Sequence, residues 1–196
     1  MPDFSEVSLL VAFTDFNRFT AQIDRLDDAD VARVLSAYYD LAGTAIRQAG
    51  GQVVKFIGDA TLAVFPADNA ERGTLALLDL KDAADQFMAE QGWDCHLVVK
   101  IHFGPVAAGE FGAGPDRRYD VLGKTVNVAA RLEASSGVAL SAEAFRRLGP
   151  DARTRFKKHT PPITYIRQED AHRPRLWARY EPRGIKHRAR NDEGHL

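Results

Sequence analysis

Short apolar runs that break into turns predict the first strands of the chain. The run from 8 to 13 indicates a buried strand, and its end releases Asp15. A second run, from 53 to 65, indicates two strands joined by a tight turn at Gly58 and Asp59, a common signal for a short hairpin. If these strands are neighbours, both carboxylates reach the same edge of one sheet.

The rest of the pattern alternates helices with strands. Apolar residues recur at helical spacing over Asp28–Gln48 and Asn69–Glu90, and glycines follow both stripes. Shorter apolar runs predict strands at Leu97–Phe103, Val138–Leu140 and Ile163–Ile166. The order of strand, helix, hairpin, helix and strands favours an α+β fold, a ferredoxin-like split βαβ sheet with helices on one face.

A further helix is predicted after Gly123, with Thr125 as its N-cap. Asn127 and Arg131 are four residues apart, so their side chains leave the same face of this helix one turn from each other. A neutral hydrogen-bonding group and a fixed cation then converge on one spot. The pattern also fits an ordinary amphipathic helix in which Arg131 pairs with a surface acid.

The two aspartates at the sheet edge suggest a two-metal site. Two hard oxygen ligands without a nearby His or Cys favour Mg²⁺ or Mn²⁺ over zinc. A metal pair at this place can activate an attacking oxygen while it neutralises a phosphate. Taken singly, Asp59 is also explained as a turn residue and Asp15 as a helix N-cap or loop residue.

Three blocks of the chain together resemble the catalytic domain of the class III nucleotidyl cyclases, which make cyclic nucleotides from nucleoside triphosphates. The resemblance runs from about Val7 to Ile166. The first block, Phe13 to Thr20, is similar to the metal-binding strand end of the family, which implies that Asp15 ligates both metal ions. The backbone that follows is implied to hold metal at Phe16 and the phosphates of the substrate at Phe16, Phe19 and Thr20.

The second and third blocks carry the residues that the family uses for the nucleotide. Lys55 to Asp59 looks like the base-reading lysine followed by the second metal aspartate. The third block is similar to the family at a base-reading aspartate, a ribose-orienting asparagine and a phosphate-binding arginine, here Asp120, Asn127 and Arg131. Three blocks in the right order, with all six polar positions filled, make a specific match.

The lysine and aspartate of these blocks indicate which base is read. Adenine presents an acceptor at N1 and a donor at its exocyclic amine, so Lys55 and Asp120 together suit adenine, whereas guanine presents the opposite pattern. Cytosine also has an amine beside a ring acceptor, so a pyrimidine nucleotide stays open. The family usually supplies one more lysine for the polyphosphate near its penultimate strand, and Lys157 or Lys158 fits that place.

The resemblance implies an adenylyl cyclase that uses two divalent cations, Mg²⁺ or Mn²⁺, to convert ATP to 3′,5′-cyclic AMP and pyrophosphate. It also implies a homodimer, because the family builds each site from both chains. Asp15 and Asp59 of one chain would then face these residues of the other: Lys55, Asp120, Asn127 and Arg131. The alternatives are a cyclase for another nucleotide, a catalytically silent nucleotide-binding module, and a diguanylate cyclase or polymerase-type palm domain. The last of these would lack the helix of Asn127 and Arg131.

Composition agrees with one soluble domain. The 196 residues carry a net charge of −1, which gives no reason to expect a nucleic acid partner. The single cysteine, Cys95, reads as a buried small side chain. No secretory signal or membrane-spanning run is recognisable, so we expect a cytoplasmic protein, and no sensor domain identifies a regulatory partner.

The C-terminal tail and one turn-rich loop are expected to extend from the compact domain. We predict a catalytic domain at 1–166 and a basic C-terminal tail at 167–196, which is rich in charge and proline, poor in aliphatic residues, and partly extended or disordered. The turn-rich segment Gly109–Arg118 reads as a loop that projects as an arm, and in the family this region helps the chains to dimerise.

Overall fold

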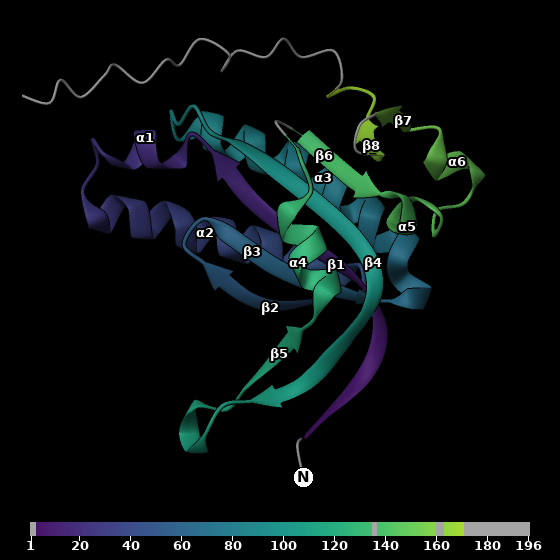
Figure 1. Cartoon of the computed structure of the whole chain (residues 1–196). Coiled ribbons are helices and arrows are strands. Elements are labelled where there is room, and N and C mark those ends of the chain that lie inside the picture. The colour runs from purple at the N-terminus through teal and green to yellow at the C-terminus, as the bar shows by residue number, and fades with distance from the viewer. Residues whose placement is uncertain (1–2, 135–136, 160–162, 171–196) are drawn as a thin grey trace, which may run out of the picture.

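An eight-stranded sheet forms the centre of the fold (Figure 1). The computed structural model describes residues 3–134, 137–159 and 163–170. Seven strands follow the order β2-β3-β1-β4-β6-β8-β7, and β5 pairs with the C-terminal part of β4. The strands are β1 (Asp3–Asn17), β2 (Gln52–Ile57), β3 (Ala60–Pro66), β4 (His96–Phe111), β5 (Arg118–Leu122), β6 (Gly137–Ser141), β7 (Phe156–His159) and β8 (Thr164–Arg167). The helices are α1 (Phe19–Ile23), α2 (Asp28–Gln48), α3 (Ala70–Glu90), α4 (Lys124–Arg131), α5 (Ala142–Phe145) and α6 (Pro150–Arg153), with short 3-10 turns η1 (Ala67–Asn69) and η2 (Gly114–Asp116).

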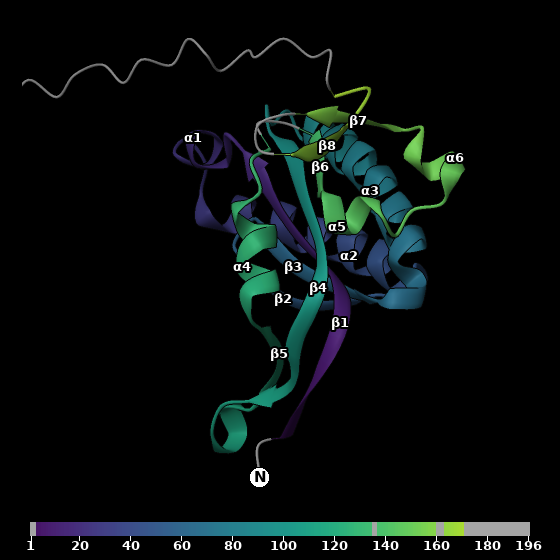
Figure 2. The ribbon, with the colours of Figure 1, turned by 45° about the vertical axis from the view of Figure 1, so that its right-hand side comes forward.

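Helices cover both faces of this sheet (Figure 2). Along β1, Leu10 and Ala12 point into the core beneath α2 and α3, whereas Leu9 and Val11 point to the other face and pack with Ala129 of α4. The predicted fold class is confirmed, and the two long helices share one face as expected. Helix α4 instead lies on the other face of the sheet. The central strands present apolar side chains on that face as well, and α4 buries them.

The arm is a continuation of β4 rather than a free loop. This strand has 16 residues and pairs on one side with the start of β1 (Asp3 opposite Glu110) and on the other with β5 (Phe111 opposite Arg118). The expected loop at Gly109–Arg118 therefore shrinks to the turn between β4 and β5, because backbone hydrogen bonds on both sides keep β4 extended. Figure 1 shows this hairpin projecting away from the helices.

The sheet continues slightly past the domain boundary that the sequence suggests. Arg167 is 4% exposed and donates two hydrogen bonds to the Asp82 carboxylate of α3, at 2.7 and 2.6 Å. The Asp170 carboxylate accepts a hydrogen bond from the backbone amide of Val138 at 3.0 Å. The first residues assigned to the tail thus pack on α3 and β6, and the remainder, 171–196, lies outside the described residues.

Candidate active site

The two predicted metal ligands meet at the end of β1. Strands β1 and β3 are antiparallel neighbours with Thr14 opposite Thr61, so the turn that carries Asp59 lies beside Asp15. The backbone amide of Phe16 donates a hydrogen bond to Oδ2 of Asp59 at 3.0 Å. Gly58, at φ 60, makes the tight turn between β2 and β3 that the sequence predicts.

Electrostatics at this edge favour a bound cation. Burial raises the pKa of the Asp59 carboxyl, and the charge of Asp15 adds to the increase, while backbone amides including that of Phe16 oppose it. A positive ion between two such carboxylates relieves the repulsion, and hard oxygen donors suit Mg²⁺ or Mn²⁺. Among the described residues, no group of three or more His, Cys, Asp or Glu side chains is placed to hold a metal. The residues present therefore fit ions that other oxygen atoms, such as those of a substrate, help to coordinate.

Two tyrosines of α2, which the sequence did not single out as site residues, support the turn before Asp59 and the end of β1. The Tyr39 hydroxyl donates a hydrogen bond to the carbonyl of Gly58 at 2.5 Å, and its ring stacks on Phe56 with centroids 3.9 Å apart. Tyr38 is fully buried, and its hydroxyl lies 3.2 Å from that of Thr14. These tyrosines look like ordinary members of the apolar helical stripe, so only the tertiary fold shows their role.

The turn after β1 places its side chains in different surroundings. The rings of Phe16 and Phe19 are buried, and Phe16 packs edge-on against Tyr38 at 4.8 Å. Only the backbone of these phenylalanines can therefore contact a ligand, whereas the Thr20 side chain is exposed. Between them, Arg18 adopts φ 61 and ψ 9, a left-handed conformation that costs an arginine roughly 1–2 kcal/mol.

Lys55 and Asp120 form an ion pair although they are far apart in sequence. Nζ of Lys55 on β2 lies 2.6 Å from Oδ2 of Asp120 on β5, with the side chains 42% and 22% exposed. The second carboxylate oxygen of Asp120 accepts a hydrogen bond from the backbone amide of Val121 at 2.8 Å, which fixes its orientation. The pair presents a cationic donor and an anionic acceptor side by side at the surface.

Helix α4 presents Asn127 and Arg131 on one exposed face, as their spacing predicts. Both line a surface hollow of about 470 Å³. Lys124 lines it as well, and the sequence analysis missed this residue although it lies three positions before Asn127 on the same face. A cation at each end of the face and an amide between them make the hollow suited to an anionic, hydrogen-bonding ligand.

The prediction that Thr125 caps α4 is wrong. The helix starts at Lys124 with Gly123 as N-cap, and the Thr125 hydroxyl instead donates a hydrogen bond to the carbonyl of Pro105 at 2.6 Å. This contact needs Gly104, because a Cβ there would lie 2.7 Å from the Thr125 Oγ1 atom. The glycine of β4 therefore lets α4 approach the sheet closely enough to hold its polar face in place.

Lys157 lies apart from the other predicted residues. It is exposed on β7, the edge strand at the opposite end of the sheet from β2 and Lys55. The role of Lys157 at the polyphosphate stays a prediction.

The Cys95 side chain is buried, which confirms the prediction from the sequence. Burial also raises the pKa of this thiol to about 11.

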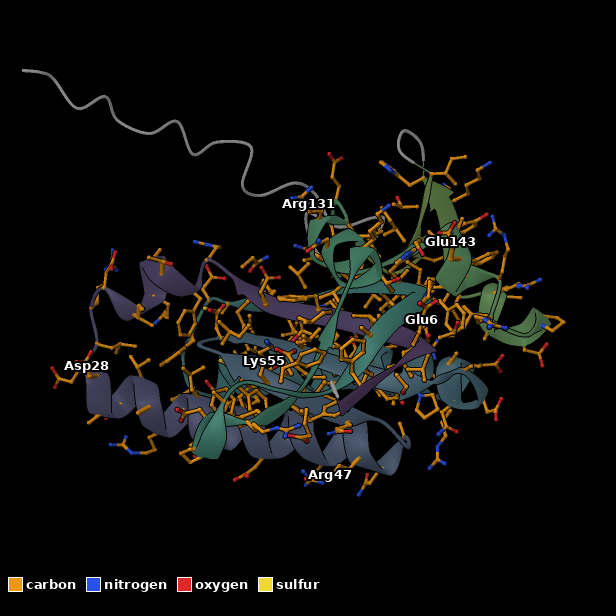
Figure 3. All side chains as sticks on the ribbon, turned by 60° about the horizontal axis from the view of Figure 1, so that its bottom comes forward. Glu6, Asp28, Arg47, Lys55, Arg131 and Glu143 are labelled. Carbon is orange, nitrogen blue, oxygen red and sulfur yellow. The ribbon has the colours of Figure 1, made fainter. Side chains whose placement is uncertain are left out.

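Within one chain, the predicted residues form three separate pairs. Asp15 and Asp59 meet at the end of β1, and Lys55 and Asp120 meet between β2 and β5. Figure 3 shows Arg131 on α4, well away from Lys55. The hollow beside α4 is lined by 124, 127, 128 and 131–133, so neither the aspartates nor Lys55 reach it.

Comparison with known proteins identifies the class of this chain as a nucleotidyl cyclase catalytic domain. The model of the adenylate and guanylate cyclase catalytic domain matches residues 1–165, so the chain belongs to that family.

Curated relatives share part of their length with this chain. An adenylate cyclase of Anabaena cylindrica is 29% identical over 133 residues, which cover 64% of this chain and 26% of that protein. Adenylate cyclase 1 of Rhizobium meliloti is 30% identical over 130 residues, which cover 62% of this chain and 20% of that protein. The chain thus spans about a quarter or less of the length of these relatives.

Solved structures share the fold. A bacterial light-regulated adenylyl cyclase superposes with a TM-score of 0.75 at 22% identity, covering 87% of this chain and 54% of that chain. A guanylyl cyclase superposes with a TM-score of 0.72 at 19% identity, covering 85% of this chain and 93% of that chain. In the described part of this chain, no helix is long and apolar enough to cross a membrane.

Proposed function

We propose that this domain is an adenylyl cyclase, which converts ATP to 3′,5′-cyclic AMP and pyrophosphate with two divalent cations, Mg²⁺ or Mn²⁺. The observation that carries the proposal is the Lys55–Asp120 ion pair, with Nζ and Oδ2 2.6 Å apart. Its donor and acceptor match the N1 acceptor and the exocyclic amine of adenine. Guanine offers a donor and an acceptor in the reverse order, so the same pair rejects it.

The other two pairs suit the chemistry of ring closure. The Asn127 amide holds the ribose so that its 3′ hydroxyl stays near the α-phosphorus, and the Arg131 guanidinium stabilises charge on the phosphoryl oxygens. Asp15 and Asp59 would hold the divalent cations, which would supply Lewis-acid chemistry that lowers the pKa of the ribose hydroxyl. The attack is intramolecular in the substrate, so no protein nucleophile is required.

The proposal includes a homodimer with sites shared between the chains. Support comes from the separation of the three pairs within one chain, since the hollow beside α4 does not include the carboxylates. Ile57, Leu122 and Val128 are exposed apolar residues on the same elements that carry the site, β2, β5 and α4. A second copy that covers them would bring the aspartates of one chain to α4 of the other.

A nucleotide panel tests the proposed activity. Purified protein is incubated with ATP, GTP, CTP or UTP in Mg²⁺ or Mn²⁺, and pyrophosphate and the cyclic product are measured. We expect ATP to be the preferred substrate, and we expect EDTA or the Asn127→Ala variant to remove most turnover. ATP binding without pyrophosphate release would identify a silent module, and preference for another triphosphate would refute the adenine assignment. We also propose a cytoplasmic location for the domain.

A further inference from the structure

The turn that follows the carboxylate strand contains a strained arginine. Among the described residues, Arg18 is the single non-glycine residue with a positive φ, at 61°. Glycine adopts this conformation without a Cβ penalty, so an arginine here is unfavourable for the backbone. Strain of this kind gathers at ligand-binding sites, and the Arg18 side chain is therefore the feature to explain.

Arg18 is held by an ion pair that a stronger anion can replace. Its guanidinium contacts the Asp94 carboxylate in the segment between α3 and β4, and the two side chains are 57% and 61% exposed. Water and salt screen such an exposed pair, so it contributes little free energy. The guanidinium is thus available to a ligand that offers more negative charge.

The turn does not depend on this ion pair for its position. Oδ1 of Asn17 accepts a hydrogen bond from the backbone amide of His96 at 2.9 Å. Oε1 of Gln22 accepts one from the backbone amide of Asp94 at 3.4 Å. These bonds already join the residues on either side of Arg18, in β1 and α1, to the start of β4 and the segment before it. Bracing alone therefore does not account for the arginine.

Arg18 also lies within reach of whatever the two aspartates hold. It follows Asp15 by three residues, a chain length that spans at most about 10 Å, and its long side chain extends that reach. A planar guanidinium donates parallel hydrogen bonds to two oxygens of one phosphate. Phosphates that share cations with Asp15 and Asp59 would lie beside this turn.

We propose that Arg18 binds the outer phosphates of the nucleoside triphosphate, and that Asp94 is its resting partner in the nucleotide-free domain. This inference rests on the proposed function, because it assigns a new contact in the same substrate site. Asp94 and the polyphosphate compete for one cation. Removing the arginine and removing the aspartate should therefore change nucleotide affinity in opposite directions.

The test compares Arg18→Gly, which removes the cation and relieves the strained φ, with Asp94→Asn, which frees the cation. Arg33→Ala is the matched control, because Arg33 is likewise an exposed arginine paired with an aspartate, Asp30, on α2. The full chain is assayed for KM and kcat with ATP, and for the dissociation constants of α,β-methylene-ATP and AMP. AMP has no outer phosphates, so its binding reports on folding and on the base and ribose contacts.

We expect Arg18→Gly to raise KM and the dissociation constant of α,β-methylene-ATP about tenfold, with kcat and AMP binding unchanged. Asp94→Asn should lower both constants about two- to fivefold, and Arg33→Ala should change neither. Unchanged analogue affinity in Arg18→Gly, or weaker affinity in Asp94→Asn, would overturn the inference. If wild-type protein releases no pyrophosphate, the proposed function fails, while the analogue measurements still decide the role of Arg18.

Discussion

The separation of the carboxylate pair from the α4 hollow predicts that two inactive variants restore each other's activity. In the proposed dimer, each site takes Asp15 from one chain and Asn127 from the other, and the two-fold axis makes both sites equivalent. A homodimer of Asp15→Ala lacks a metal ligand in both sites. A homodimer of Asn127→Ala lacks the ribose contact in both. When the chains mix, one site of the heterodimer collects both substitutions and the other collects none.

The size of the recovery follows from this geometry. In an equal mixture with free exchange, about half of the dimers are mixed, and each has one intact site of two, so activity returns to about a quarter of wild type. Removing a group that stabilises charge in the transition state typically reduces turnover by about 10²–10³-fold. The recovered activity should therefore exceed the residual activity of either parent by at least about twentyfold.

The assay is pyrophosphate release after incubation of the two variants, with exchange verified by capture of differently tagged chains. A mixture of Asp15→Ala with Asp59→Ala is the matched control. Both of these substitutions affect the metal half, so every site of that heterodimer carries one of them and activity should stay low. Demonstrated exchange without recovery, or equal recovery in the control mixture, would show that the site is not shared between chains.

Three further predictions concern the base, the metal edge and the support of α4. Lys55→Glu combined with Asp120→Cys reverses the donor and acceptor, so ATP turnover should fall about a hundredfold or more and GTP should be admitted; a folded variant that keeps ATP turnover shows that the pair does not read the base. Asp59→Asn should remove most turnover yet raise the melting temperature of metal-free protein at neutral pH, because burial raises the pKa of this carboxyl and its ionisation opposes folding. That gain should vanish as the pH falls below the pKa of an ordinary aspartate, where the wild-type side chain is protonated in both states, and a melting temperature that is lowered at neutral pH would contradict the argument. Gly104→Ala should destabilise the domain by about 1–3 kcal/mol and reduce turnover, and adding Thr125→Ala should restore part of the loss, as denaturation and kinetics of the double variant will show.

Regular elements with strong apolar periodicity could be predicted closely from the sequence. The predicted helix Asp28–Gln48 coincides with α2, and α3 begins one residue later than predicted. Strand β4 was predicted to end at Phe103 but continues to Phe111. Its later half is rich in Gly and Ala, which favour a turn locally, and pairing with β1 and β5 overrides that preference.

The site shows the same division between local and tertiary information. The turn of Asp59 and the shared face of Asn127 and Arg131 follow from spacing along one element, so the sequence was sufficient. The hydrogen bond from Tyr39 to the Gly58 carbonyl joins distant elements, and nothing in the local pattern marks it. The left-handed backbone of Arg18 was equally hidden, because such a conformation is normally signalled by glycine or asparagine.

The Lys55–Asp120 ion pair has a thermodynamic consequence, because it joins the edge strand β2 to β5, which belongs to the projecting hairpin. The closed pair leaves further N–H donors on Lys55 and acceptor sites on Asp120, so a base that engages both side chains adds a second bridge between β5 and β2. Linkage is reciprocal: any contact that holds β5 beside β2 favours base binding by the same free energy that base binding contributes to that contact. An intermolecular contact made at the hairpin is therefore coupled to occupancy of the base site without a separate regulatory domain.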